Sequence, residues 1–540
     1  MGTDQQAASR VARDYDYVRG RLLQRQEIAF LDVREEAPHA EGHPLFAANF
    51  PLARIELDAY TRLPRRDVPI VTLDGGEGLA ELAAQRLAAL GYSDVGVFEG
   101  GLEAWKTAGG ELFIDVNVPS KAFGELMEAV CHTPSFSAQE VKAMLDAGAD
   151  MVVVDVRRFD EYQTMSIPTG ISVPGAEVVL RVPDLASSPD TRVIVNCAGR
   201  TRSMIGAQSL INAGLPNPVA ALRNGTIGWV LAQQQLDFGR SRSFPPTPDA
   251  SLRAARERAR AVADRAGVKR AGKDQLAQWA SQQGRTSYFF DVRSQDEYER
   301  GHLPGFRAVP GGQLVQETEM VAPVRGARIV LFDDQGARAD MSASWLAQMA
   351  WEVYVLDGVQ AADLSETGPW RPELPPLPHT PEVDAATLHD WLAAGDVVVL
   401  DLAGHAAYRN GHVPGAWYAL RSQLGAAVAA LPAASRYVLS SDDGLLARFA
   451  APELVHAVSG EVYVLDGGTR AWAQAGYPMQ TGDTHLASEP IDRYQRPYEG
   501  TDAPPEAMQA YLDWEFGLIE QLGRDGTHHF RPLSAAGEDH

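Results

Sequence analysis

The chain of 540 residues lacks several features that mark particular classes of protein. It has only two cysteines, Cys131 and Cys197, so a disulfide framework is excluded and a reducing, cytoplasmic location is expected. No apolar run approaches the roughly 18 residues of a membrane-spanning helix. Residues 1–17 lack the apolar core of a secretory signal, so none is expected.

Positive charge is also scarce. Lys and Arg number 48 against 71 Asp and Glu, which gives a net charge of −23. Nucleic acids and anionic membranes are bound through basic faces, so neither is an expected partner. The hydrophobic fraction of 45% is ordinary for a globular chain, and the length predicts about three to five domains.

What the sequence does contain is a fourfold internal repeat. Each unit opens with a short apolar run that ends at an acidic residue: Asp32, Asp155, Asp291 and Asp401. A second apolar run follows, and the residue after it lies 42 positions beyond the first landmark in three units and 40 in the fourth. These residues are Asp74, Cys197, Asp333 and Ser441.

A third landmark closes each unit about 30 residues later. It is a turn containing glycine that leads to Trp105, Trp229 or Trp472, with Asp363 at this place in the third unit. Helical stretches such as 79–90 and 203–213 alternate with the apolar runs, which are too short for helices and are typical of buried parallel strands. The repeat therefore predicts four α/β domains, each with a mostly parallel sheet flanked by helices.

The landmarks set the expected domain boundaries. The units are placed at 20–112, 136–238, 270–368 and 382–480, followed by a C-terminal tail at 485–540 with one helix over 505–523. The longest break, 237–273, is expected to divide the chain into two pairs of units.

One of the four loops that follow the second apolar runs carries residues suited to catalysis. The second unit carries a nucleophile that can act at neutral pH, within the run Cys197-Ala198-Gly199-Arg200-Thr201-Arg202-Ser203. The loop follows a central strand and precedes a helix, which is where open α/β sheets bind ligands.

The residues around this cysteine suit an anionic substrate. Gly199 allows successive N–H groups to turn inward as an anion nest, and Arg200 and Arg202 add two permanent cations. Lowering the pKa of Cys197 from about 8.5 by about two units would make roughly three quarters of it thiolate at pH 7. The loop thus predicts nucleophilic cysteine chemistry with a lowered pKa. Ser203 is expected to cap the helix, to contact substrate, or both.

The whole pattern resembles the rhodanese superfamily over about residues 20–480. The segment Asp155-Val-Arg157 and the run Gly301-His302-Leu-Pro-Gly305 are similar to the first signature region of that family, and the turn from Asn224 to Trp229 is similar to its closing motif. The resemblance implies sulfane sulfur transfer without a cofactor or metal. Cys197 would take sulfur from thiosulfate or a low-molecular persulfide, become a persulfide, and pass the sulfur to a thiol or cyanide.

By the same resemblance, Ala198, Gly199, Arg200, Thr201, Arg202 and Ser203 would bind substrate, and Asp155, Arg157 and Trp229 would support the loop. Ala198 departs from the basic residue common in two-domain thiosulfate enzymes, which leaves the donor open. A protein could also serve as the sulfur acceptor.

Two alternatives remain open. The second unit could hold a persulfide for a specific protein partner, with the other units acting as an interaction scaffold. Phosphatase or arsenate reductase chemistry is disfavoured because four residues separate Cys197 from Arg202, whereas those related enzymes use five.

The other three units are expected to be catalytically silent. The carboxylates of Asp74 and Asp333 cannot carry sulfane sulfur, and Ser441 has no neighbouring base apart from acidic residues. Cys131, in an amphipathic stretch, is expected to pack as a small hydrophobic residue.

Overall fold

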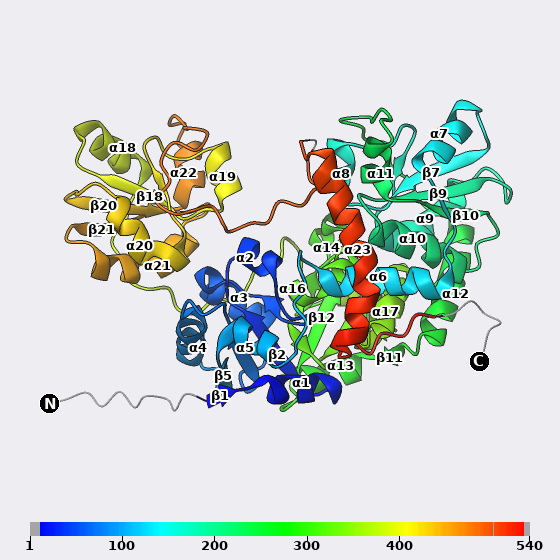
Figure 1. Cartoon of the computed structure of the whole chain (residues 1–540), viewed down its shortest axis with the longest axis horizontal. Helices are drawn as coiled ribbons and strands as arrows, with labels where there is room; N and C mark the ends of the chain where they lie inside the picture. Colours follow the sequence, from blue (N-terminus) through cyan, green and yellow to red (C-terminus); the bar gives the residue numbers. More distant parts are fainter. Residues whose placement is uncertain (1–10, 501, 534–540) are drawn as a thin grey trace.

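The computed structural model describes residues 11–500 and 502–533. Residues 1–10, in which no signal is expected, and residues 501 and 534–540 of the predicted tail lie outside the described residues. The chain forms four sheets with similar strand orders, one in each unit (Figure 1). In each, the strand ending at the acidic landmark pairs with the strand that precedes the loop. The predicted α/β fold with four mostly parallel sheets is confirmed.

The first unit has five strands of its own and borrows a sixth from the third unit. The order is β1-β5-β4-β2-β14, with β3 beside β2, and every pair is parallel except β2 with β14. The strands are β1 (Val11–Arg13), β2 (Ile28–Asp32), β3 (Ala48–Asn49), β4 (Ile70–Leu73), β5 (Val95–Phe98) and β14 (Val324–Arg325). The helices are α1 (Tyr15–Leu23), α2 (Glu36–Glu41), α3 (Ile55–Arg62), α4 (Leu79–Ala89) and α5 (Gly101–Thr107).

The second unit follows the long helix α6 (Val118–Cys131) and has the order β6-β10-β9-β7-β8. Its strands are β6 (Ser135–Phe136), β7 (Met151–Asp155), β8 (Ile171–Ser172), β9 (Arg192–Asn196) and β10 (Val219–Leu222). Its helices are α7 (Ala138–Asp146), α8 (Phe159–Thr164), α9 (Val178–Arg181), α10 (Thr201–Asn212) and α11 (Gly225–Leu231). The register pairs Asp155 with Asn196, so the acidic landmark lies beside the end of the strand that leads to Cys197.

The third unit repeats this order as β11-β16-β15-β12-β13. Its strands are β11 (Lys269–Ala271), β12 (Ser287–Asp291), β13 (Arg307–Ala308), β15 (Arg328–Phe332) and β16 (Glu352–Leu356). Its helices are α12 (Asp249–Arg265), α13 (Lys273–Ala280), α14 (Gln295–Arg300), α15 (Gly311–Gln316), α16 (Thr318–Val321) and α17 (Arg338–Gln348).

The fourth unit has the order β17-β21-β20-β18-β19. Its strands are β17 (Glu382–Val383), β18 (Val398–Asp401), β19 (Trp417–Tyr418), β20 (Arg436–Ser440) and β21 (Glu461–Leu465). Its helices are α18 (Ala385–Ala394), α19 (His405–Asn410), α20 (Leu424–Ala427), α21 (Leu445–Ala457) and α22 (Gly468–Gln474). The last helix of the chain, α23 (Pro505–Asp525), confirms the helix predicted over 505–523.

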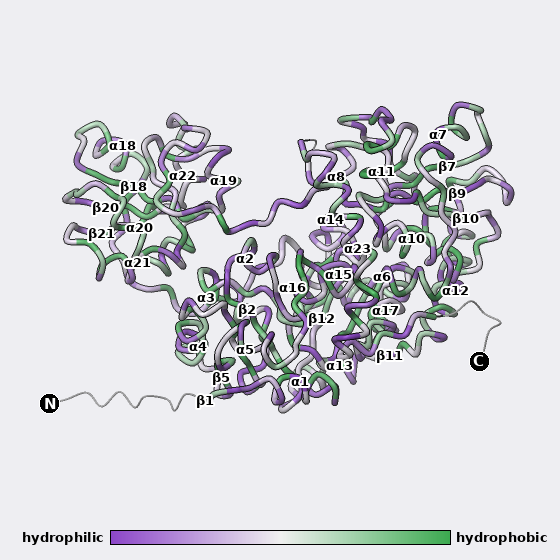
Figure 2. Tube along the Cα trace, in the orientation of Figure 1, coloured by the Kyte–Doolittle hydropathy of each residue, from purple (hydrophilic) through white to green (hydrophobic). Residues whose placement is uncertain are grey.

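The central strands are apolar because helices cover both faces of each sheet, so their side chains are buried on both sides. All five residues of β2 are buried, as are four of the five in β9. Figure 2 shows hydrophobic residues along the central strands, whereas the segment that leads from the fourth unit to α23 is mainly hydrophilic.

The expected division into two pairs of units at 237–273 is wrong. Helix α12, from this segment, packs on α17 of the third unit and on α9 of the second. Its buried residues Ala255, Ala259 and Val262 belong to a hydrophobic core that the first three units share. The fourth unit has separate cores, and its contact with the first unit includes ion pairs such as Arg421 with Glu56. The helix in the break joins units instead of separating them.

Candidate functional site

The Cys197 loop lies between β9 and α10. The Cys197 thiol donates a hydrogen bond to Ser203 Oγ at 3.3 Å, and the Ser203 hydroxyl donates to Arg200 O at 2.9 Å. Helix α10 begins at Thr201, so Ser203 lies inside the first turn and its side chain does not cap the helix. Of the two roles expected for Ser203, the capping role is therefore wrong. Its hydroxyl instead faces the sulfur.

The closing turn of the repeat holds this loop from beneath. Thr226 donates to Cys197 O through both its N–H and its hydroxyl, each at 2.9 Å, and Ile227 N–H donates to Ala198 O at 2.9 Å. A Cβ on Gly225 would lie 2.4 Å from Cys197 O, and this glycine has φ +52°. Only glycine lets the turn approach the loop this closely.

Two further predicted residues anchor the strands beside the loop. Arg157 Nη2 donates to Asp155 Oδ2 at 2.7 Å and to Met165 O at 2.6 Å, and Asn196 Nδ2 donates to Asp155 Oδ2 at 2.9 Å. All are buried. The first and third units have the same arginine–aspartate pair. Trp229 is fully buried and donates from Nε1 to Gln235 O at 2.8 Å.

The two arginines of the loop have different partners. Arg202 makes a two-point ion pair with Glu161, at 2.8 and 2.9 Å. Arg200 is engaged by Glu125, at 2.8 and 2.9 Å, and also by Glu128. The charge of Arg200 is thus matched by two carboxylates and that of Arg202 by one.

The predicted lowering of the Cys197 pKa is wrong for this structure. Burial raises the pKa of the thiol, since the side chain is 1% exposed and the thiolate would lose its hydration. The positive charge of Arg202 and the hydrogen bonds between the sulfur and Ser203 oppose the increase without overcoming it.

At the three other loops, a different side chain occupies the place of the thiol. Asp74 accepts hydrogen bonds from the N–H groups of Gly76 and Ala80, at 2.9 and 3.0 Å. Asp333 likewise accepts from Gly336 and Ala339. These carboxylates consume the donors that would otherwise hold a sulfur-borne anion. In the fourth unit, Ser441 Oγ accepts from Ala447 N–H at 3.3 Å.

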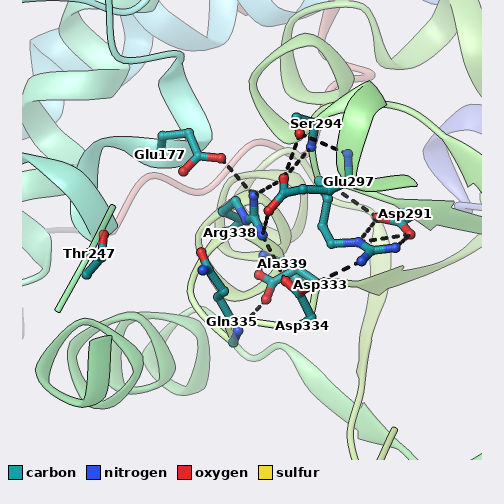
Figure 3. Close-up of polar contacts among 12 residues, drawn as sticks. Glu177, Thr247, Asp291, Ser294, Glu297, Asp333, Asp334, Gln335, Arg338 and Ala339 are labelled. Atoms are coloured by element: carbon teal, nitrogen blue, oxygen red, sulfur yellow. Dashed lines mark hydrogen bonds and ion pairs between the residues drawn. The ribbon is translucent and has the colours of Figure 1, made fainter. Parts of the chain in front are cut away.

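Arg338 in the third unit shows how the surroundings of Arg202 differ from those of the equivalent arginine in a loop without cysteine. Each arginine lies five residues after the loop position and pairs with a glutamate 41 residues earlier. Figure 3 shows Arg338 between Glu297 and Glu177, with Asp334 as a third carboxylate partner at 2.9 Å. Asp334 takes the position that Ala198 has in the second unit. Arg202 is therefore balanced by one carboxylate, whereas three carboxylates surround Arg338.

The repeat pattern did not identify the residues that cover the loop. The chain returns from the fourth unit and lays α23 across α6 and against the second unit (Figure 1). Tyr511 Cε1 lies 3.2 Å from the position of a Cβ on Gly199, and Thr201 Oγ1 lies 3.5 Å from Glu515 Oε1. One sequence signal was present: Glu515 interrupts the apolar face of α23, between Leu512 and Leu518.

Two cavities of about 340 Å³ each reach Arg202. The polar one is lined by five arginines, Arg157, Arg158, Arg202, Arg493 and Arg496, and by four acidic residues, Asp160, Glu161, Glu317 and Glu499. The apolar one lies between the second and third units, and its lining includes Val156, Ile205, Phe244, Val292, Met341 and Trp345. An anion and a largely apolar molecule could thus approach the same guanidinium from different sides.

Other features of the described chain carry less chemistry. Cys131 is half-buried and donates to Leu533 O at 3.1 Å, and burial raises the pKa of its thiol. Within residues 11–500 and 502–533, no group of three or more His, Cys, Asp and Glu side chains is arranged to hold a metal ion. No helix in the same range has the length and apolar character needed to cross a membrane.

The chain matches a family of known proteins in sequence and a solved protein in structure. The family described as Rhodanese-like domain matches residues 16–108, 137–232, 273–359 and 384–475. A crystal structure of thiosulfate sulfurtransferase from Pseudomonas aeruginosa is 61% identical, covering 97% of this chain and 100% of that one, with a TM-score of 0.96.

Two shorter matches cover single stretches. A rhodanese-related protein from Thermoplasma volcanium is 20% identical over 19% of this chain and 99% of its own, with a TM-score of 0.18. An uncharacterised 16.5 kDa protein of Synechococcus elongatus is 46% identical over 46 residues, which are 8% of this chain and 31% of that protein's length.

Proposed function

This chain belongs to the rhodanese family, and from that premise we propose that it is a sulfurtransferase that moves the outer sulfur of thiosulfate to a thiol or cyanide through a persulfide on Cys197. The observation that carries the proposal is the contrast between loops. In the second unit a thiol faces the helix start beside Arg202, which is paired with a single carboxylate, whereas aspartates fill the loops of the first and third units. The likeness to a thiosulfate sulfurtransferase supports thiosulfate as the donor.

The reaction takes two displacements at sulfur. The Cys197 thiolate attacks the outer sulfur of thiosulfate, a new S–S bond forms, the S–S bond of thiosulfate breaks, and sulfite leaves with the electron pair. Cyanide or a thiolate then attacks the outer sulfur of the persulfide, and the Cys197 thiolate is released. No cofactor or change of overall oxidation state is required.

The proposed roles of the loop residues follow their placement. The Cys197 sulfur is the nucleophile, and Ser203 and the N–H groups of the loop hold the anion that it becomes. Arg202 would attract the anionic donor, which would enter through the polar cavity, where five arginines stand against four carboxylates. Arg200, held by Glu125 and Glu128, fixes the loop to α6.

Formation of thiocyanate from thiosulfate and cyanide tests this function. The wild type and the matched control Cys131→Ser should turn over alike, and Cys197→Ser should be inactive. Turnover by Cys197→Ser equal to that of the wild type would overturn the proposal.

A second candidate function is favoured by one observation: Cys197 is 1% exposed, in a loop whose Gly199 lies against Tyr511 of α23. A persulfide carrier that serves a protein partner would protect its sulfur in this way. A persulfide that forms with thiosulfate but reacts slowly with cyanide and small thiols would favour the carrier over the small-molecule enzyme.

A further inference from the structure

Helix α23 brings one acidic side chain to the Cys197 loop. Glu515 is 0% exposed, and its Oε1 accepts hydrogen bonds from the Tyr511 hydroxyl at 2.8 Å and from the Thr201 hydroxyl at 3.5 Å. Its other oxygen, Oε2, has no partner among the described residues and lies 3.6 Å from the position of a Cβ on Gly199. A buried oxygen directed at a ligand-binding loop without a partner is unusual in a folded protein.

The packing around Glu515 excludes water from this carboxyl group. Ala198 and Ile227 of the second unit form a hydrophobic cluster with Tyr498, Tyr511 and Leu512 of the C-terminal segment. The chain crosses from the fourth unit to place this cluster on the one loop that carries a cysteine (Figure 1). A carboxylate here would be poorly hydrated, so the neutral acid is the favoured form.

The charged groups that face Glu515 come from two elements, α6 and the Cys197 loop. On α6, Glu125 disfavours its ionisation and Lys121 favours it; on the loop, Arg200 favours it. Each cation already has a carboxylate partner, since Lys121 pairs with Asp115 at 2.8 Å and Arg200 pairs with Glu125. Burial first, and Glu125 second, raise the pKa of Glu515 to about 8.

Two tyrosines complete this set, Tyr511 on α23 and Tyr498 before it. Burial raises the pKa of both phenols, so both are neutral near pH 8. The Tyr511 hydroxyl stabilises the ionised form of Glu515 by donating to it, and this lowers the pKa of the carboxyl group.

We propose that Glu515 is a positioning residue for sulfur transfer. While Glu515 is a neutral acid, an anionic donor can reach the Cys197 loop; when Glu515 ionises, its negative charge repels the donor. This rests on the proposed function. A thiolate and a thiosulfate dianion bring three negative charges to a buried loop where Arg202 is already paired with Glu161. A fourth negative charge at residue 515 would repel the donor and would further raise the pKa of Cys197.

The experiment measures two quantities on the full chain between pH 6.5 and 9.5. One is the single-turnover rate of persulfide formation with thiosulfate. The other is the thiolate content of Cys197, read as the absorbance at 240 nm minus that of Cys197→Ser. Dividing the rate by the thiolate content removes the titration of the nucleophile itself. The variants are Glu515→Gln, Tyr511→Phe and, as matched control, Glu520→Gln on the exposed side of α23.

In the wild type and Glu520→Gln, the rate per thiolate should fall about ten-fold between pH 7 and pH 9, as a group with pKa about 8 ionises. Glu515→Gln should remove this decrease and should shift the Cys197 titration to lower pH. Tyr511→Phe, which removes a hydrogen bond to the carboxylate, should move the decrease to higher pH. A decrease that persists unchanged in Glu515→Gln, or a Cys197 titration that it does not move, would overturn the proposal.

The two failures can be separated. If no protein forms a persulfide with thiosulfate, the proposed function fails, but the Cys197 titration still reports on Glu515. If persulfide forms with a rate per thiolate independent of pH, the function stands and the role of Glu515 is refuted.

Discussion

The contact between Gly225 and the Cys197 loop gives the sharpest structural prediction. In Gly225→Ala the new Cβ would lie 2.4 Å from Cys197 O and 2.7 Å from Gly199 O, so the loop must retreat by about 1 Å to reach ordinary contact distance. A shift of about 1 Å at a reacting group is expected to slow chemistry by about 10²-fold.

Stability should fall as well. The left-handed φ costs alanine about 1–2 kcal/mol. Weakening the hydrogen bonds from Thr226 and Ile227 to the loop adds about 0.5–1.5 kcal/mol for each bond lost. If all three bonds were lost, the total for Gly225→Ala would be about 2.5–6.5 kcal/mol, which is large for a single substitution.

Gly214→Ala is the matched control. Gly214 lies in the same unit with φ +67°, and a Cβ there would meet no atom of the described residues within 4 Å, so alanine adds only backbone strain of about 1–2 kcal/mol. Calorimetry and single-turnover persulfide formation, measured below both unfolding transitions, should show a modest stability loss with a wild-type rate for Gly214→Ala. A Gly225→Ala variant that reacts as fast as its control would refute the argument.

The remaining predictions concern charge at the loops. Arg202→Met should raise the pKa of Cys197, because Arg202 favours the thiolate, and Glu161→Gln should lower that pKa by freeing the arginine. Titration of the thiolate absorbance at 240 nm measures both shifts. Shifts of the same sign in the two variants would contradict this prediction. Asp333→Cys in a Cys197→Ser background should gain no sulfur from thiosulfate, since Arg338 is neutralised by three carboxylates. Intact mass measures this, and sulfur uptake at position 333 would contradict it.

Much of the fold could be predicted from the sequence because its signals are local. The short apolar runs that end at Asp155 and its equivalents mark strand ends, and the predicted helix over 505–523 agrees with α23 at Pro505–Asp525. The closing turn of the third unit differs from the other three, and this difference is visible in the sequence. Val359 replaces the glycine found at Gly225, and a short 3-10 turn at Ala361–Asp363 replaces the helix that bears tryptophan elsewhere.

The residues of α23 that lie against the Cys197 loop could not be predicted in the same way. Glu515 meets Thr201 across 314 positions of the chain, and no repeat or motif links the two. The pKa of Cys197 was predicted in the wrong direction because the cations are visible in the loop sequence, whereas the burial that outweighs them arises only in the folded chain. The partners of Arg200 on α6 are a further long-range feature.

The most direct test of the central claim is the intact mass of the protein after incubation with thiosulfate and then with cyanide. We expect the wild type to gain one sulfur atom, cyanide to remove it, and Cys197→Ser to gain none. A wild type that gains no mass with thiosulfate, or a Cys197→Ser variant that gains the same sulfur, would contradict the assignment of sulfur transfer to Cys197.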